Sequence, residues 1–355
     1  METIVVEKEK IQELRNELLK RKNKIDIVVR ANKLKMAGDG SLIVPIPNSG
    51  GITEVMPTQW AQSQIAEYVG IPVNYFRKLQ GYPELFAYNA NYWLSRSNDM
   101  RMVRMINGEA IAYLSNAYRA IDNYYVATSV LQVAMETLEK QGLTMQVHRA
   151  YLTDRVFDMS LMTLETPIEY PSGEKYRLGM HIRNSEVGAA AFAVKAMVVR
   201  YACGNGQIFG DPISQRHIGK RLTEGNVWSQ RTQTLANLVT LSQIKDMAQY
   251  SFSLSNAKKF TDEAEKLHEQ PIEPTVEYIR ASEKVLQLTE EETRSIWEKV
   301  RENNRYELVQ AITSTANTTF RTNPERGTEL QELGGALVEQ PSIWDAVERT
   351  SRRRK

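Results

Sequence analysis

Two runs near the middle of the chain have the pattern of half-buried β-strands. Residues 176–183 alternate loosely between apolar and polar side chains, and residues 192–201 are rich in β-branched valine. A polar break at residues 184–188 separates the two runs, and the Gly-Asn-Gly sequence at residues 204–206 favours a tight reversal after the second. The pattern therefore predicts neighbouring antiparallel strands joined by short turns.

Further strands are predicted upstream of this pair. Asn107-Gly108 lies between two apolar runs and is the strongest short hairpin signal in the sequence. Residues 143–166 have the pattern of two more strands around Thr153-Asp154. The middle of the protein is thus predicted to be a run of antiparallel strands.

The N-terminal segment is predicted to form a helix and then a hairpin. Residues 5–24 carry apolar side chains at spacings of three and four, which is typical of an amphipathic helix. Such a helix lies on the protein's own core or against a partner. Residues 25–30 and 41–46 are expected to pair as a short hairpin around residues 38–40, which read Gly-Asp-Gly.

Helices are predicted on both sides of the strands. Asp122 precedes an apolar-periodic run at residues 125–138 and is expected to cap that helix. A longer helical pattern covers residues 225–253, and an acidic, helix-rich segment follows it. The final stretch, residues 321–337, contains one proline and three glycines and is expected to be a loop. Three short helices are also expected between the N-terminal hairpin and the Asn107-Gly108 hairpin, at residues 58–69, 72–79 and 83–94.

These elements indicate an α+β protein with a central antiparallel sheet, a long helix packed on it, and helical regions at both ends. Four segments are expected along the chain. They are residues 1–50 with the N-terminal helix and hairpin, residues 51–255 with the α+β core, residues 256–320 with the acidic helices, and residues 321–355 with a loop and a basic tail.

Composition is that of an ordinary cytoplasmic protein. The 355 residues, 42% of them hydrophobic and 25% charged, can bury one large core or two modest ones. The longest uncharged apolar runs are far shorter than the roughly 20 residues that cross a bilayer, and the N-terminus has no signal-like apolar stretch. A single cysteine, Cys203, excludes an intramolecular disulfide. No membrane contact is predicted, and the expected location is the cytoplasm of a bacterial or phage-infected cell.

Charge is distributed unevenly along the chain. The net charge is +2, but residues 177–231 hold eight Lys or Arg against three Asp or Glu. Residues 262–307 hold thirteen acidic residues against seven basic ones. A basic centre suits contact with a polyanion.

Few residues suggest catalysis. The four histidines are not spaced as a metal pair and Cys203 has no second cysteine, so neither a structural zinc site nor a cofactor is predicted. No phosphate-binding loop or dinucleotide fingerprint is present. Glu186 with Asp122 or His181 would suit an acid–base pair or a magnesium site, although carboxylates in turns are more often caps or solvated. Cys203 is expected to be a small buried hydrophobe or, beside basic groups, a reactive thiol.

Basic side chains on the predicted strands are interleaved with tyrosines. Cations neutralise phosphates and aromatic rings stack on bases, which is what single-strand binding requires, although aromatic residues on strands also form cores. The predicted phosphate contacts are Arg101, Arg104, Arg119, Lys195, Arg200, Arg216, His217, Lys220 and Arg221, with Tyr118 and Tyr201 available for stacking.

Four short motifs occur in a fixed order. They are NAYRAIDN at residues 116–123, NSEVG at 184–188, CGNG at 203–206 and RHIGK at 216–220. Together they resemble the phage/plasmid-like protein family, a group of uncharacterised proteins from phages, plasmids and prophages. The resemblance covers residues 55–320 and implies a mobile-element origin. Its motif residues in this chain are Asn184, Glu186, Gly188, Cys203, Asn205 and Gly206.

These features lead to the hypothesis of a phage or plasmid DNA-metabolism protein without enzymatic activity that binds single-stranded DNA. In recombination it would anneal strands as a homo-oligomer, because strands followed by one long helix are similar in outline to the core of single-strand annealing proteins. One alternative is an assembly protein of a mobile element that uses its N-terminal helix. Another is a metal-dependent nuclease that uses Asp122 and Glu186.

Overall fold

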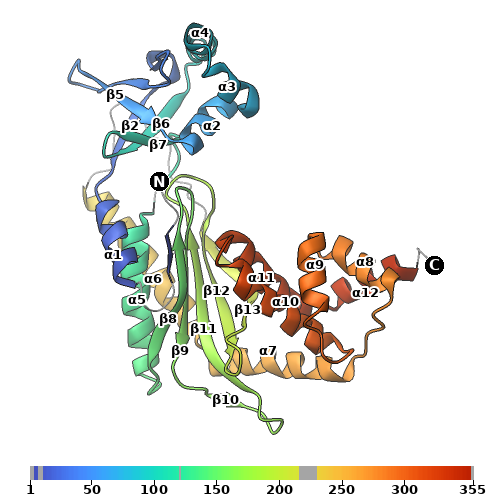
Figure 1. The fold of residues 1–355 in the computed structure, drawn as a ribbon. Coiled ribbons are helices and arrows are strands. Elements are labelled where there is room, and N and C mark those ends of the chain that lie inside the picture. The colour runs from blue at the N-terminus through green and yellow to red at the C-terminus, as the bar shows by residue number, and fades with distance from the viewer. Residues whose placement is uncertain (1–3, 7–10, 120, 216–229, 353–355) are drawn as a thin grey trace.

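The computed structural model describes residues 4–6, 11–119, 121–215 and 230–352. It has two lobes (Figure 1). The upper lobe is built from residues 25–115, and the lower lobe from the residues before and after them. The chain therefore passes between the lobes at two places, near residue 24 and near residue 116.

A mixed six-stranded sheet organises the upper lobe. Its strand order is β2-β6-β7-β5-β4-β3, and all neighbours are antiparallel except β5 and β7. Three helices cover one face, where Ile27, Val103 and Phe86 share a core. The strands are β2 (Ile25–Arg30), β3 (Lys35–Met36), β4 (Leu42–Pro45), β5 (Ile52–Pro57), β6 (Met100–Ile106) and β7 (Glu109–Ser115), and the helices are α2 (Gln59–Tyr68), α3 (Val73–Leu79) and α4 (Pro83–Leu94).

A seven-stranded antiparallel sheet organises the lower lobe. Its order is β1-β8-β9-β11-β12-β13, with β10 beside β11. The strands are β1 (Ile4–Val6), β8 (Met145–Leu152), β9 (Phe157–Thr163), β10 (Ile168–Glu169), β11 (Lys175–Asn184), β12 (Phe192–Arg200) and β13 (Gly206–Gln215). In Figure 1 these long strands stand in the centre of the molecule.

Helices cover the apolar face of this sheet. Leu178, Met180 and Ile182 alternate along β11 and lie in one core with Val126 and Val130 of α5, because alternate residues of a strand point to the same face. The covering helices are α1 (Ile11–Lys20), α5 (Asn123–Glu139) and α6 (Gln230–Ser251).

The opposite face of the same sheet carries polar side chains. Ser160, His181 and Lys195 are cross-strand neighbours and form one row. His181 Nε2 lies 2.9 Å from Asp158 Oδ2, and both side chains are almost fully buried. Helix α11 (Pro324–Glu339) lies over this face, and its Glu332 accepts a hydrogen bond of 2.7 Å from Lys195 Nζ. Polar side chains thus line one part of this face, and α11 packs directly on the β13 backbone beside the apolar cluster of Met162, Met197, Val199 and Ile208.

The C-terminal part is a bundle of helices beside β13 (Figure 1). Thr289 and Glu292 form a capping box at the start of α9, which satisfies two backbone N–H groups. No helix in the described ranges is long and apolar enough to span a membrane. Besides α11, the bundle contains α7 (Leu254–Lys266), α8 (Val276–Val285), α9 (Glu290–Trp297), α10 (Arg305–Thr319) and α12 (Pro341–Arg352).

The predicted α+β class and most central strands are confirmed. Asn107 and Gly108, with φ values of 50° and 82°, form the two-residue turn between β6 and β7. The two strands predicted within residues 143–166 are β8 and β9. The runs at residues 176–183 and 192–201 are β11 and β12.

Two predictions for the N-terminal segment are wrong. Residues 5–24 do not form one helix, because Ile4–Val6 pair with β8 as the edge strand β1 before α1 begins at Ile11. Residues 25–30 and 41–46 do not pair as a hairpin. β2 pairs with β6 and β4 pairs with β3 and β5, so the sheet joins strands from both sides of residue 50, where the sequence predicts a segment boundary.

The loop predicted at residues 321–337 is also wrong, because α11 spans most of it. Asn323 caps this helix by accepting a hydrogen bond of 3.1 Å from the Arg326 N–H, and Pro324 occupies the first turn, where proline loses no helical bond. Gly334 and Gly335 are buried against neighbouring elements. Tertiary packing therefore outweighs the low helix propensity of glycine.

Candidate nucleic-acid interface

Arg101 and Arg104, both predicted to contact phosphates, lie three residues apart on β6 and point to opposite faces of the upper sheet. The Arg101 guanidinium lies 4.4 Å from the ring centroid of Tyr68 and 4.7 Å from that of Tyr113. This cation is therefore held between two tyrosines of its own lobe.

Arg104 is buried at the junction of the two lobes. Only 2% of its surface is exposed, and its guanidinium contacts the carboxylates of Asp122 and Asp26. Burial disfavours the charged form, but these carboxylates together raise the pKa of Arg104. The side chain stays charged and has no exposed surface to offer a phosphate.

The next three predicted cations lie at separate places in the lower lobe. Arg119 donates a hydrogen bond of 3.3 Å to Thr240 Oγ1 on α6, and Lys195 pairs with α11 as described above. Arg200 at the end of β12 makes a two-pronged pair with Glu174, whose Nε to Oε2 distance is 2.6 Å. The hydrogen bonds of Glu174 are the main cause that raises the pKa of Arg200. These cations serve internal contacts and do not gather on one surface.

The two predicted stacking residues differ in exposure. Tyr118 donates a hydrogen bond of 2.8 Å to the Ser185 carbonyl oxygen, and burial raises its pKa. Tyr201 is 55% exposed, with the Arg177 guanidinium 4.9 Å from its ring centroid. The remaining predicted contacts, Arg216, His217, Lys220 and Arg221, lie outside the described residues.

The NSEVG motif forms the turn between β11 and β12 and inserts into the upper lobe. The Val187 carbonyl oxygen accepts hydrogen bonds from Trp60 Nε1 at 2.9 Å and from Gln64 Nε2 at 2.8 Å. Gly188 has a φ of 82°, and a Cβ atom there would overlap the side chain of Leu114. The motif therefore joins the lower sheet to α2 and β7.

Two polar residues of the same motif fix the start of α5. Glu186 Oε1 accepts a hydrogen bond of 2.6 Å from the Asn123 backbone N–H and forms an ion pair with Lys24 Nζ at 2.9 Å. Asn184 Nδ2 donates to Asn123 Oδ1 at 2.7 Å and to the Ile121 carbonyl oxygen at 2.8 Å. Motif residues distant in sequence thus meet in one buried joint between the lobes.

The CGNG motif lies at the other end of β12. Asn205 is buried and donates to the Gln310 carbonyl oxygen at 3.2 Å, and Gly206 begins β13. Cys203 is exposed, so the prediction that it is a small buried hydrophobe is wrong. It occupies the turn after β12, where its sulfur lies 3.9 Å from Arg200 Nη1.

The carboxylates of the nuclease alternative are already neutralised. Asp122 pairs with Arg104, and Glu186 pairs with Lys24. Asp122 occupies the N-cap position of α5, but its side chain accepts no capping hydrogen bond there. Among the described residues, no group of three or more His, Cys, Asp or Glu is placed to hold a metal ion. Glu186 therefore acts in place of a cap for α5 in this structure.

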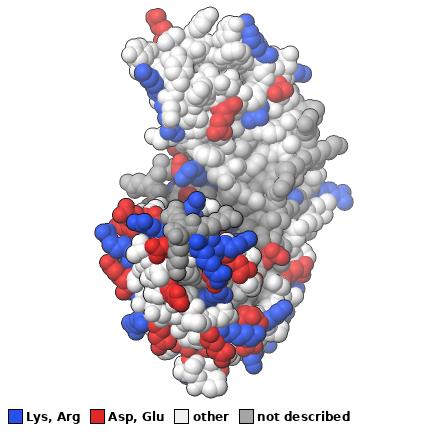
Figure 2. Space-filling view, turned by 90° about the vertical axis from the view of Figure 1, so that its right-hand side faces the viewer, with Lys and Arg blue, Asp and Glu red and all other residues white. Residues whose placement is uncertain are grey.

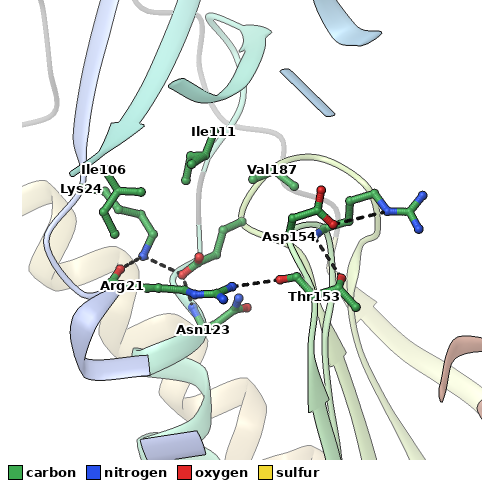
Figure 3. A pocket seen from close by; sticks show the side chains of 10 residues that line it. Arg21, Lys24, Ile106, Ile111, Asn123, Thr153, Asp154 and Val187 are labelled. Carbon is green, nitrogen blue, oxygen red and sulfur yellow. Dashed lines mark hydrogen bonds and ion pairs between the residues drawn. The ribbon is translucent and has the colours of Figure 1, made fainter. Parts of the chain in front are cut away.

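Figure 3 shows a small cavity at the junction of the lobes, and Glu186 is one of the residues that line it. Its volume is about 10 Å³, which is room for about one water molecule. Arg21 and Lys24 point into it from the end of α1, and Arg21 Nη1 donates to the Thr153 carbonyl oxygen at 3.0 Å. The joint is therefore closely packed and offers no space for a nucleotide.

An exposed aromatic surface lies on α4 in the upper lobe. Tyr82, Tyr88, Tyr92 and Trp93 are between 38% and 67% exposed. The Tyr88 and Tyr92 ring centroids are 6.1 Å apart, and those of Tyr92 and Trp93 are 5.2 Å apart. We call these four residues, together with Arg96, the α4 aromatic surface. The Arg96 guanidinium stacks 3.5 Å from the Tyr92 ring centroid.

Charge around the α4 aromatic surface is sparse and positive. Residues 71–98 contain three basic residues, Arg77, Lys78 and Arg96, and one acidic residue, Glu84. All three basic side chains are exposed. The two lobes differ in their surface charge on the face shown in Figure 2. The upper part of this face is mostly uncharged, whereas the lower part carries closely mixed Lys, Arg, Asp and Glu.

The sequence contains a signal for the α4 aromatic surface that the strand-based interpretation missed. Phe86, Ala90 and Leu94 recur every four residues and are the buried side of α4. Tyr88 and Tyr92 have the same spacing on the exposed side. A helix with large apolar residues all round is either buried or has a second contact surface. The helix was predicted correctly at residues 83–94, but its outer face was not assigned a role.

No family model matches the chain, and no curated protein or solved structure matches it. The resemblance of its motifs to the phage/plasmid-like protein family therefore remains a prediction. Functional inference depends on the chain's own geometry.

Proposed function

We propose that the protein binds single-stranded DNA through the α4 aromatic surface and has no catalytic role in doing so. The observation that carries the proposal is the contiguous exposed group of Tyr88, Tyr92 and Trp93, with Arg96 over the Tyr92 ring, on the outside of the upper lobe. Exposed rings cost solvation free energy in the free protein, and unpaired bases supply flat apolar faces that cover them. Arginine stacked on a ring adds a positive charge beside the bases.

The charges beside the aromatic surface support a nucleic-acid ligand. Arg77 and Lys78 end α3, and Arg96 follows α4, so basic groups lie at the end of α4, whose exposed rings would contact the bases, and at the end of the helix before it. This arrangement combines backbone neutralisation with stacking, which is how sequence-tolerant single-strand binders work. Bases in a duplex are already stacked on one another, so the proposal favours single strands. In a mobile element such a protein would serve DNA metabolism, including strand annealing.

Removing two rings should weaken binding strongly. We expect Tyr88→Ala/Tyr92→Ala to lower the affinity for a labelled single-stranded oligonucleotide by at least about 30-fold. The reason is that base–aromatic stacking contributes about 1–3 kcal/mol per base, and about 1.4 kcal/mol corresponds to tenfold. Fluorescence anisotropy at low salt measures this effect. Tyr201→Ala, which removes an exposed tyrosine of the lower lobe, is the matched control and should bind as the wild type does.

Salt and competitor experiments define what would contradict the proposal. With three basic groups in contact, the slope of log affinity against log salt should be about −2, and a duplex of the same sequence should bind more weakly. Equal binding by the double variant would contradict the α4 aromatic surface as the contact. Absence of wild-type binding at low salt would favour a protein partner instead, because Tyr, Trp and Arg also dominate protein interfaces.

A further inference from the structure

The upper sheet has a second apolar surface, on the face opposite its three helices (Figure 1). Val44 and Val55 of the β4–β5 hairpin point toward the helices and belong to the core of the upper lobe. Alternate residues of a strand point to opposite faces, so Ile52 and Met56 lie on the other face, where they are 69% and 45% exposed. Val187 packs on the β6 and β7 part of that face, whereas the hairpin part is open to solvent.

Two residues of opposite charge flank this open surface. Lys35 of β3 is the cross-strand neighbour of Ile43, and Ile43 is in turn the neighbour of Glu54 on β5. Lys35 and Glu54 are both exposed, and Ile43 between them is half-buried. Because neighbouring strands are evenly spaced, about 4.8 Å apart, the cation and the carboxylate start at equal distances on either side of Ile43. We call these three residues, together with Ile52 and Met56, the hairpin face.

We infer that the hairpin face packs against the hairpin face of a second copy of this chain. A twofold interface uses the same surface on both protomers, so the charges of that surface must complement themselves. When the twofold axis runs parallel to the strands, over β4, Lys35 of one protomer lies opposite Glu54 of its partner, and the reverse pair forms as well. Ile43 then meets its own copy at the centre, and the two sheets stack with their strands aligned, as in β-sandwiches.

Charge selects this orientation over the other twofold arrangement. An axis across the strands would place each Lys35 opposite Lys35 and each Glu54 opposite Glu54, and such like-charge contacts oppose association. Burial of Ile52 and its apolar neighbours removes apolar surface from water, which favours association. Helices α2, α3 and α4 lie on the other side of the sheet, so both α4 aromatic surfaces stay accessible in the pair.

Ile52→Asp tests the contact with little disturbance of the protomer, because this side chain is 69% exposed. By analytical ultracentrifugation we expect the wild type to sediment as a dimer. Ile52→Asp should raise the dimer dissociation constant at least about tenfold, since the contact would bury an unpaired carboxylate. Val276→Asp is the matched control, because it puts the same charge on another β-branched residue, which is 58% exposed at the start of α8. It should dimerise as the wild type does.

An exchange of the two charges tests the orientation. Lys35→Glu should weaken the dimer at least about tenfold, because it places carboxylates opposite each other across the axis. Lys35→Glu/Glu54→Lys restores opposite charges there and should recover most of that loss. Because Glu54 also accepts a hydrogen bond from Ser41 Oγ, circular dichroism checks that each variant keeps the wild-type fold.

Three results would overturn the pairing of hairpin faces. They are a monomeric wild type, a dimer that Ile52→Asp leaves intact, and a dimer that Val276→Asp weakens as much as Ile52→Asp does. A folded Lys35→Glu/Glu54→Lys variant that dimerises no better than Lys35→Glu would overturn it as well, since the two charges would then not face each other.

Discussion

Arg104→Met should lower the free energy of unfolding by about 3 kcal/mol. Removing one partner of a buried ion pair typically costs about 3–5 kcal/mol, because the remaining charge is left in a poorly solvated place. The lower end applies here, since the side chains of Asp26 and Asp122 are 31% and 40% exposed and can recruit water. Urea denaturation monitored by circular dichroism measures the change.

The pH dependence of stability and a second substitution test whether the unpaired Asp26 carboxylate causes the loss of stability in Arg104→Met. Burial raises the pKa of Asp26, and the Arg104 charge opposes that effect, so the pKa rises further once Arg104 is removed. A carboxyl group whose pKa is raised in the folded state destabilises the folded protein at pH values above that pKa. Below that pKa the group is protonated, and the destabilisation is relieved. The loss of unfolding free energy caused by Arg104→Met should therefore become smaller as the pH falls through the Asp26 pKa. Arg104→Met/Asp26→Asn should recover part of the loss at neutral pH, and an equal loss at every pH would show that packing alone is responsible.

Gly335→Ala should also lower the free energy of unfolding by about 3 kcal/mol. A Cβ atom at this residue would lie far inside 3.0 Å of the Ile208 carbonyl oxygen, which is backbone of β13 and cannot rotate away. Alanine gains about 1 kcal/mol over glycine in helix propensity, but overpacking against backbone costs more. Helix α11 must therefore move off the sheet.

A glycine in open surroundings is the control for this second prediction. At Gly81 the nearest atom to an added Cβ is the Lys78 carbonyl oxygen at 3.7 Å, an ordinary contact. Gly81→Ala should change the free energy of unfolding by less than about 0.5 kcal/mol, as surface substitutions usually do. If Gly335→Ala were as stable as the wild type in thermal and urea unfolding, the close contact between α11 and β13 would be refuted.

Local signals in the sequence were enough to predict the central strands. The turn at Asn107-Gly108 requires positive φ, and residues 176–183 and 192–201 show strand patterning, so local chemistry and long-range pairing agree there. The N-terminal segment differs because β1 and β2 each find a partner more than 70 residues away. Such pairings leave no local signature. Likewise, the glycines of α11 mark a close helix–sheet contact, not a loop.

The candidate site was harder to predict for a related physical reason. A sequence shows which residues are basic but not which acids lie beside them, and Arg104 and Arg200 each meet a carboxylate from another element. The NSEVG motif was singled out correctly as a special turn, but its role as a joint depends on Trp60 and Gln64 in the other lobe. The exposed aromatic residues of α4 can be told from its buried residues only by their solvent exposure, which the structure supplies and the sequence does not.

Ultraviolet cross-linking to a single-stranded thymine oligonucleotide, followed by tryptic peptide mapping, tests the central claim most directly. Trypsin cleaves after Lys78 and Arg96, so one peptide, residues 79–96, contains all four rings of the α4 aromatic surface. We predict that this peptide carries the main cross-link and that Tyr88→Ala/Tyr92→Ala reduces it strongly. Cross-links concentrated on peptides of the lower lobe would contradict the account.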